Sequence, residues 1–187
     1  TGGGQRARLL ALVGTENMDF EADFTEPWLF GIPLRWDVSG YWRNVIYDDW
    51  EEERIGVTTA LTKRVFDEFT SISGGYTFEH VRIHRMDRDL SPELRSQRGS
   101  DYVGRLHFTI DRDTRDSALV PTSGYNINLL TSLTSKALGG SHDYVRFEIK
   151  GSNYVSFFDK MLTLSVGGKL GMVGMLDDWG GEAPLYE

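Results

Sequence analysis

The sequence predicts an all-β protein, an antiparallel meander of about nine strands that forms part of a transmembrane β-barrel. Three observations support this prediction. Apolar and polar residues alternate with a period of two in one segment after another. The alternating segments are roughly ten residues long or longer, whereas strands of soluble proteins average nearer five or six residues. The connections between them alternate in character between short turns and longer polar loops, as in barrels with a periplasmic and an extracellular end.

The alternation is clearest in five of the segments, of which Asn17–Thr25 is the first. Its apolar residues are Met18, Phe20, Ala22 and Phe24, and the residues between them are polar. Successive side chains of a strand point to opposite faces, so this segment has one apolar and one polar face. The expected strands are Arg6–Val13, Asn17–Thr25, Pro33–Asn44, Arg54–Thr62, Phe69–Arg85, Asp101–Asp111, Tyr125–Lys136, Asp143–Gly151 and Met161–Met172, with weaker alternation in the first, fourth, fifth and seventh.

The two faces of these strands favour a barrel wall. Arg, Asp, Glu and Lys recur on the polar face of strand after strand, where a water-filled lumen can hold them and a dry core cannot. A strand of about 9 to 11 residues is also the length that a tilted crossing of a bilayer needs. The residues expected to contact lipid are Phe20, Trp36, Leu106, Phe147 and Leu164, and those expected to face the lumen are Asp19, Arg35, Arg105, Arg146 and Lys169.

The connections predict which end of the barrel is which. The shorter ones, TEPWLFGIP, RVFDE, RDTRDSALVPTSG and FFDK, are expected at the periplasmic end, and loops such as HRMDRDLSPELRSQRGSD at the extracellular end. Trp28, Phe66, Phe157 and Phe158 lie at the short-turn ends, as an aromatic girdle at a membrane interface would. A soluble β-sandwich with one wet face per sheet gives the same alternation and is the alternative fold.

Composition excludes several classes of protein. The net charge is -8, with 28 acidic against 20 basic residues, and no basic stripe suggests nucleic-acid binding. The absence of Cys excludes disulfides, thiol catalysis and Cys-ligated zinc. No run approaches the roughly 18 apolar residues of a membrane helix. The chain begins at Thr1 without Met or a signal sequence, so we expect a processed start or an internal piece of a longer protein.

Two metal-like patterns occur, and neither is expected to bind a metal. Asp111 and Asp113 begin like a calcium loop, but Arg115 occupies the third ligand position and no central Gly follows. His80 and His84 have the spacing of zinc ligands on a helix. In a strand they would lie roughly 13 Å apart, which is too far to share one ion.

An acidic run next to Trp50 is expected to be a solvated loop, because acid–base catalysis needs carboxylates held in different environments. Trp50 itself could touch lipid headgroups. The glycine-rich start matches no phosphate-binding pattern, and no nucleophile motif is present, so we expect neither enzymatic activity nor a cofactor. The acidic residues are Asp48, Asp49, Glu51, Glu52 and Glu53.

Three stretches carry a resemblance to a known family. DFTEPWLFGIP at Asp23–Pro33, RDTRDSALVPTSGYNINL at Arg112–Leu129 and APLYE at Ala183–Glu187 resemble landmarks of BamA-type outer-membrane barrels, of the bacterial surface antigen family. The similarity runs along essentially the whole chain, in matching order and spacing. It implies that both turns are periplasmic and that the full barrel has about 16 strands. Residues 1–187 would then be part of a C-terminal barrel domain, from the turn before its third strand into its sixth extracellular loop.

The resemblance also implies a function and partners. It implies a protein of the bacterial outer membrane that folds and inserts other outer-membrane proteins without cofactor, covalent intermediate or ATP. Its partners would be the bilayer, unfolded client proteins and periplasmic accessory lipoproteins bound through POTRA domains, which this chain lacks. The Arg-Gly-Phe/Tyr motif of the sixth loop and the strands of the lateral gate are missing as well. A related barrel for two-partner secretion or autotransporter assembly is the alternative, and the number of POTRA repeats upstream would separate these branches.

The turn motifs are expected to be structural. Carboxylates and arginines would pair with each other and cap turn amides, while proline restricts and glycine relaxes the backbone. Because bacterial single-chain barrels close with an even number of strands, we also expect these residues to form a curved sheet that does not close on itself. The residues assigned to the turns are Glu26, Pro27, Asp111, Arg112, Asp113, Arg115, Asp116, Pro121 and Gly124.

Overall fold

The structure is a computed structural model that describes residues 3–47, 50–84 and 99–176. Nine strands and two short 3-10 helices follow one another along this part of the chain. They are β1 (Arg6–Val13), β2 (Asn17–Glu26), η1 (Leu29–Gly31), β3 (Leu34–Ile46), β4 (Glu51–Arg64), β5 (Thr70–His84), β6 (Gly99–Asp113), β7 (Gly124–Thr134), η2 (Lys136–Leu138), β8 (Tyr144–Phe157) and β9 (Leu162–Met175).

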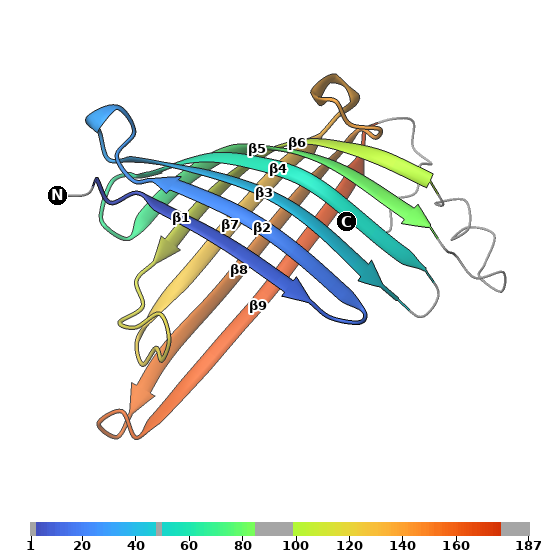
Figure 1. Ribbon diagram of the computed structural model, residues 1–187. Helices are drawn as coiled ribbons and strands as arrows, with labels where there is room; N and C mark the ends of the chain where they lie inside the picture. The colour runs from blue at the N-terminus through green and yellow to red at the C-terminus, as the bar shows by residue number, and fades with distance from the viewer. Residues whose placement is uncertain (1–2, 48–49, 85–98, 177–187) are drawn as a thin grey trace.

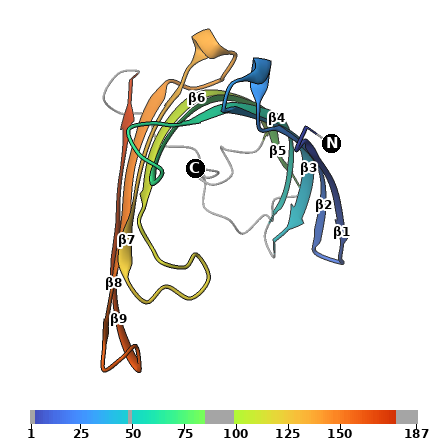
Figure 2. The same ribbon diagram turned by 90° about the vertical axis from the view of Figure 1, so that its left-hand side faces the viewer.

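The strands form one sheet in which each pairs only with its neighbours in the chain, in the order β1-β2-β3-β4-β5-β6-β7-β8-β9. Every pair is antiparallel, from β1 with β2 to β8 with β9. The sheet curves into an arch whose edges, β1 and β9, remain apart (Figures 1 and 2). The all-β class, the meander and the open sheet are therefore confirmed. The described strands form no second sheet, which excludes the β-sandwich alternative.

The connections lie at two rims of the arch. Those after β2, β4, β6 and β8 gather at one rim, on the left in Figure 1, which we call the motif rim because it carries both recognised turns. The described connections after β1 and β7 lie at the opposite rim. Several strands are longer than expected, and β4 begins at Glu51 rather than at Arg54. The difference in connection length between the rims is consequently smaller than the sequence suggested.

The register assigns every strand residue to a face, because directly paired residues of neighbouring strands lie on the same side of a sheet. Asp19 pairs with Arg43, and Phe20 with Trp42 in the next row. Side chains converge on the concave side of a curved sheet and diverge on its convex side. The Asp19 side chain is 17% exposed, whereas Phe20 is 44% exposed. The polar face is therefore concave and the apolar face convex.

The described residues contain little conventional core. Val81, Ile83 and Val103 are buried on the concave side of β5 and β6, and Trp50 packs against them. Large apolar side chains are instead exposed over the convex face. None of the described residues belongs to a helix that is long and apolar enough to span a membrane.

Candidate functional site: the concave face and the motif rim

The structure separates the residues assigned to lipid from those assigned to the lumen. Their positions follow from the strand register, since neighbours in a strand alternate between faces. Which medium touches each face stays a prediction. Phe20, Trp36, Leu106, Phe147 and Leu164 lie on the convex face, and Asp19, Arg35, Arg105, Arg146 and Lys169 lie on the concave face.

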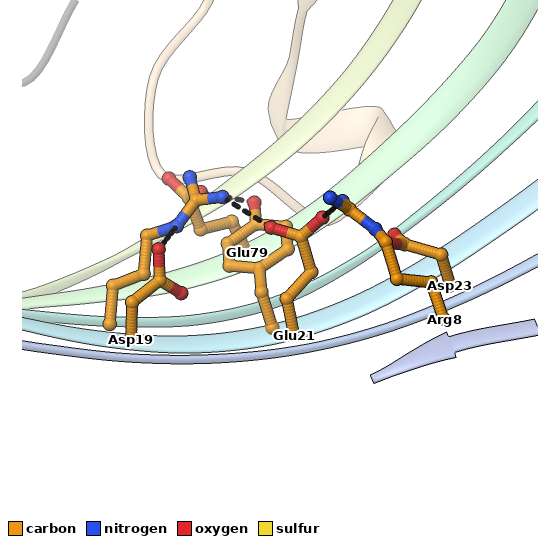
Figure 3. Close-up of polar contacts among 7 residues, drawn as sticks. Arg8, Asp19, Glu21, Asp23 and Glu79 are labelled. Carbon is orange, nitrogen blue, oxygen red and sulfur yellow. Dashed lines mark hydrogen bonds and ion pairs between the residues drawn. The ribbon is translucent and has the colours of Figure 1, made fainter. Parts of the chain in front are cut away.

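A ladder of ion pairs crosses the first three strands on the concave face (Figure 3). Arg8 of β1 contacts Glu21 at 2.5 Å and Asp23 at 2.7 Å, both on β2. Arg43 of β3 contacts the same Glu21 at 3.1 Å and Asp19 at 3.2 Å. Glu21 is thus shared by two arginines from the strands on either side. Each exposed pair adds little stability by itself, but a shared carboxylate holds three strands in one register.

A second brace joins β3 to β5 across β4. Tyr41 donates its hydroxyl hydrogen to Glu79, whose other oxygen lies 3.7 Å from Arg54. The Tyr41 ring passes over Gly56, where a Cβ atom would come within 2.7 Å of the ring. Arg43 lies 4.7 Å above the same ring, a cation–π distance. Glycine at position 56 is what lets the tyrosine reach across the intervening strand.

A third cluster surrounds Glu148 on β8. This carboxylate is 3% exposed and contacts Lys150 at 2.8 Å, Lys169 at 2.8 Å and Arg146 at 3.0 Å. Nearby, Arg105 donates to the Tyr144 hydroxyl at 3.1 Å. Because Lys169 lies on β9, the shared carboxylate links β8 to β9. Among the residues that the structure describes here, Glu148 has no second carboxylate beside it of the kind that acid–base catalysis uses.

The connection between β6 and β7 is held by its own side chains. The Arg115 guanidinium donates two hydrogen bonds, of 2.8 and 2.6 Å, to the two carboxylate oxygens of Asp113. Asp116 accepts the N–H groups of Thr122 at 2.8 Å and Ser123 at 3.1 Å, and the Thr122 hydroxyl as well. These donors hold the pKa of Asp116 far below its usual range. Pro121 and Gly124 flank this capped segment, and Gly124 takes a left-handed φ of 94°.

Two residues that the sequence grouped with this turn act elsewhere. Asp111 lies within β6 and accepts hydrogen bonds from Asn126 at 3.4 Å and Asn128 at 3.2 Å on β7. Arg112 points to the other face of β6 and donates to Asp67 at 2.6 Å in the preceding connection. Adjacency in the chain suggested one cluster, but strand alternation sends neighbouring side chains to opposite faces.

The Arg112–Asp67 pair predicts a pH dependence at the motif rim. Donation by Arg112 lowers the pKa of Asp67 to about 2, against an ordinary value of about 3.9. A depressed folded-state pKa stabilises the fold above the unfolded-state value, and this contribution is lost as the pH falls through the folded-state value. We expect the Phe69 amide, which donates to Asp67 at 3.1 Å, to resist hydrogen exchange from pH 7 to about 4 and to lose protection towards pH 2. Asp67→Asn should remove this pH dependence, and a wild-type loss centred well above pH 4 would contradict it.

The Thr-Glu-Pro turn is fastened by Glu26. Its carboxylate accepts the Trp28 N–H at 3.0 Å and the Gln5 side-chain amide at 2.5 Å, and Pro27 follows directly. We expect Glu26→Gln to keep most of this geometry, because an amide oxygen still accepts the N–H. Folding and thermal stability should then change little, and so should the client insertion that the family resemblance implies, as in the control Glu16→Gln at the opposite rim. Loss of client insertion with folding and thermal stability intact would rule out a purely structural role.

The prediction that the acidic run forms a solvated loop is wrong. Glu51 and Glu52 belong to β4 and are only 7% and 8% exposed. Glu52 pairs with Arg54, while Glu51 accepts from Asn44 at 2.8 Å, so partners on β3 and β4 offset the cost of burying these carboxylates. Glu53 also lies in β4, and Asp48 and Asp49 lie outside the described residues. Trp50 stacks on Tyr47 at 4.8 Å and packs against the small core on the concave side.

The two histidines have separate surroundings. The His80 ring packs 4.8 Å from Tyr102, and His84 lies 3.3 Å from Glu51. Within the part of the chain that the structure describes, no group of three or more His, Cys, Asp or Glu residues is placed to hold a metal. The predicted aromatic residues of the motif rim are exposed, with Phe66 at 95% and Phe158 at 75%.

Comparison with known proteins assigns the family. A model described as the Omp85 superfamily domain matches residues 1–187. The chain belongs to the Omp85 superfamily. It is 23% identical over 186 residues to the outer membrane protein assembly factor BamA of Nitratidesulfovibrio vulgaris (strain Hildenborough). It also matches the crystal structure of BamA from Haemophilus ducreyi lacking POTRA domains 1–3, with a TM-score of 0.84 and 17% sequence identity over 98% of this chain.

This Omp85 chain is shorter than the relatives it matches. It spans 23% of the N. vulgaris protein and 38% of the solved H. ducreyi chain. The resemblance to a BamA-type partial barrel is confirmed, and the chain is a segment of an outer-membrane β-barrel. The assignment of residues 1–187 to a C-terminal barrel domain, with POTRA domains outside the chain, stays a prediction.

Sequence reasoning missed the braces around Tyr41, Gly56, Glu79 and Glu148. The alternation places Tyr41, Glu79 and Glu148 on polar faces, which was a usable signal. Nothing local to the chain shows that Tyr41 and Glu79 meet, because the contact depends on two successive strand registers.

Proposed function

We propose that this chain is part of the barrel of an outer-membrane protein assembly factor that folds and inserts client β-barrels. The observation that carries the proposal is the match of the whole chain to the Omp85 superfamily, joined to its similarity to a curated BamA. Assembly factors of this type are generally not enzymes, and we propose the same here. Client polypeptides and the bilayer would be the partners of the barrel, and accessory lipoproteins those of its POTRA domains.

An uneven apolar band on the convex face supports a role in perturbing the bilayer. On β4 the band runs from Ile55 to Leu61, roughly 20 Å along the strand, and the outward residues beyond it are Glu53 and Lys63. On β9 all outward residues from Leu162 to Met172 are apolar or glycine, roughly 34 Å along the strand. A bilayer thins to match a shorter hydrophobic surface. The protein would therefore thin the membrane beside β4 and lower the barrier to client insertion there.

Widening the narrow band tests this mechanism. Glu53 and Arg82 face each other on β4 and β5, 3.5 Å apart, at the edge of the band that is farther from the motif rim. Replacing both by leucine extends the band by one row, about 7 Å along the strand. We expect the full-length double variant, Glu53→Leu with Arg82→Leu, to insert an unfolded client into liposomes about two- to tenfold more slowly than wild type. The difference should grow with acyl-chain length.

The matched control removes an ion pair from the other face. Arg35 and Asp37 lie 2.7 Å apart on the concave side of β3. Arg35→Leu with Asp37→Leu should leave the dependence of insertion on bilayer thickness unchanged. Equal rates of client insertion for the two double variants in thick bilayers would contradict thinning of the membrane by the convex face. If the protein transported a client across the bilayer and did not insert it, the alternative function, a barrel for two-partner secretion, would replace the proposed one.

A further inference from the structure

The convex face contains an apolar groove that the proposed assembly role does not explain. Its volume is about 610 Å³, within the range of small-molecule sites. Trp36, Leu61, Tyr76 and Leu106 contribute outward side chains, and Gly74 forms part of its floor. The 3-10 turn η1, which rises outside the arch in Figure 2, adds Leu29 and Phe30 as a further wall.

The walls of the groove are held in place. The Trp36 indole N–H donates to Thr59 at 2.8 Å, and its ring packs edge-on against Phe24 at 6.3 Å. The Tyr76 hydroxyl donates to the Leu138 carbonyl at 2.7 Å. These contacts fix the side-chain torsions of both aromatic residues. A groove whose walls are fixed before binding loses less entropy when an apolar chain enters it.

The backbone conformation of Phe30 is unusual for a bulky residue. Phe30 has a φ of 54° and is 90% exposed. A left-handed conformation is costly for a bulky residue, and the exposed Phe66 and Phe158 of the same rim adopt it too. What distinguishes Phe30 is that its side chain forms the outer wall of the groove.

A positive charge lies where a lipid phosphate would be expected. Lys63 follows Leu61 by two residues on the same face of β4, about 7 Å nearer the motif rim. It is exposed and forms no ion pair with the described residues. Lysine can extend along an apolar surface while its ammonium group stays at the headgroup level. An apolar groove and a cation in this order match an acyl chain and a phosphate group.

We propose that this groove is a phospholipid site of the periplasmic leaflet, with one acyl chain lying between Phe30, Trp36 and Tyr76 and the phosphate contacting Lys63. The site is continuous with the apolar convex face, so a lipid enters it from the bilayer without crossing water. The inference rests on the proposed membrane orientation, in which the motif rim is periplasmic. A phospholipid bound here would stay with the barrel while surrounding lipids exchange.

Native mass spectrometry of the full-length protein with added phosphatidylglycerol or phosphatidylethanolamine tests the site. The wild type should retain one phospholipid. Gly74→Leu should weaken retention about tenfold or more by filling the floor, and Phe30→Gly should weaken it while relieving backbone strain. Lys63→Gln should lower affinity for phosphatidylglycerol about two- to fivefold. Gly174→Leu is the matched control, because at both Gly74 and Gly174 an added Cβ meets nothing within 4 Å.

Loss of the bound lipid in Gly74→Leu and Phe30→Gly, with retention in Gly174→Leu, supports the site. Equal retention in all variants, or a retained peptide in place of a lipid, overturns it. Quenching of tryptophan fluorescence by brominated lipids separates this failure from failure of the convex face to contact lipid. Normal quenching without a specific adduct rejects the groove alone, whereas absent quenching rejects the lipid contact of the convex face.

Discussion

Leu170→Arg is expected to block assembly of the full barrel, whereas Lys169→Leu, one residue away, should be tolerated. Leu170 is 63% exposed on the convex face and pairs with Ile149 inside the apolar band. An arginine facing lipid costs up to about 2–4 kcal/mol, with the largest cost near the bilayer midplane. Lys169 faces the other way, and without it Glu148 keeps Arg146 and Lys150 as partners.

Folding yield into liposomes, read from heat-modifiable migration in gels, measures both variants. Leu164 and Leu170 lie equally far from the two ends of the apolar band on β9, so Leu164→Arg should fold about as poorly as Leu170→Arg and worse than Lys169→Leu. Equal yields for Leu170→Arg and Lys169→Leu would show that the two faces of β9 meet the same medium. A wild-type yield for Leu164→Arg would place that residue outside the hydrocarbon.

Gly124→Ala is the second substitution with a large expected effect. Gly124 ends the capped connection and starts β7 with a φ of 94°, and an added Cβ would lie 2.3 Å from the Thr114 carbonyl oxygen. The left-handed backbone and the overlap together should destabilise the barrel by about 2–4 kcal/mol. Denaturant unfolding of the full-length protein in detergent measures this loss as a lower midpoint.

The control for Gly124 is Gly168→Ala on β9. An added Cβ there meets nothing within 4 Å, and its φ lies outside the left-handed region. Its unfolding midpoint should stay near that of wild type. An unchanged midpoint for Gly124→Ala would mean that the turn can rearrange around an alanine, and the structural role assigned to this motif would be lost.

The strands and their faces were predictable because each face of a barrel wall meets a single medium. In β2 and β9 the alternation of Phe20 with Asp19, or of Leu170 with Lys169, encodes the face directly. The start of β4 was not predictable in the same way. The sequence predicted a loop at Glu51 and Glu52 because charged runs are usually solvated. Only their partners, Asn44 on β3 and Arg54 on β4 itself, make a buried position possible.

The candidate site was predictable only where its contacts are local in sequence. Asp113 with Arg115 and Asp116 with Thr122 are near neighbours, and the turn motif already suggested such pairing. The Tyr41–Glu79 brace and the convex groove join residues from strands far apart in the chain. Their formation depends on registers and on the curvature of the sheet, which no short stretch of sequence contains.

Cysteine scanning along β8 tests most directly whether this chain is a barrel wall between lipid and water. The chain has no cysteine of its own, so single replacements can be read without background from this segment. In the full-length protein in liposomes, Arg146→Cys and Lys150→Cys should react with a membrane-impermeant thiol reagent, and Phe147→Cys and Ile149→Cys should not. Spin labels at Phe147 and Ile149 should be relaxed by oxygen rather than by a water-soluble nickel complex. Equal reactivity along β8, or the reverse alternation, would contradict the account.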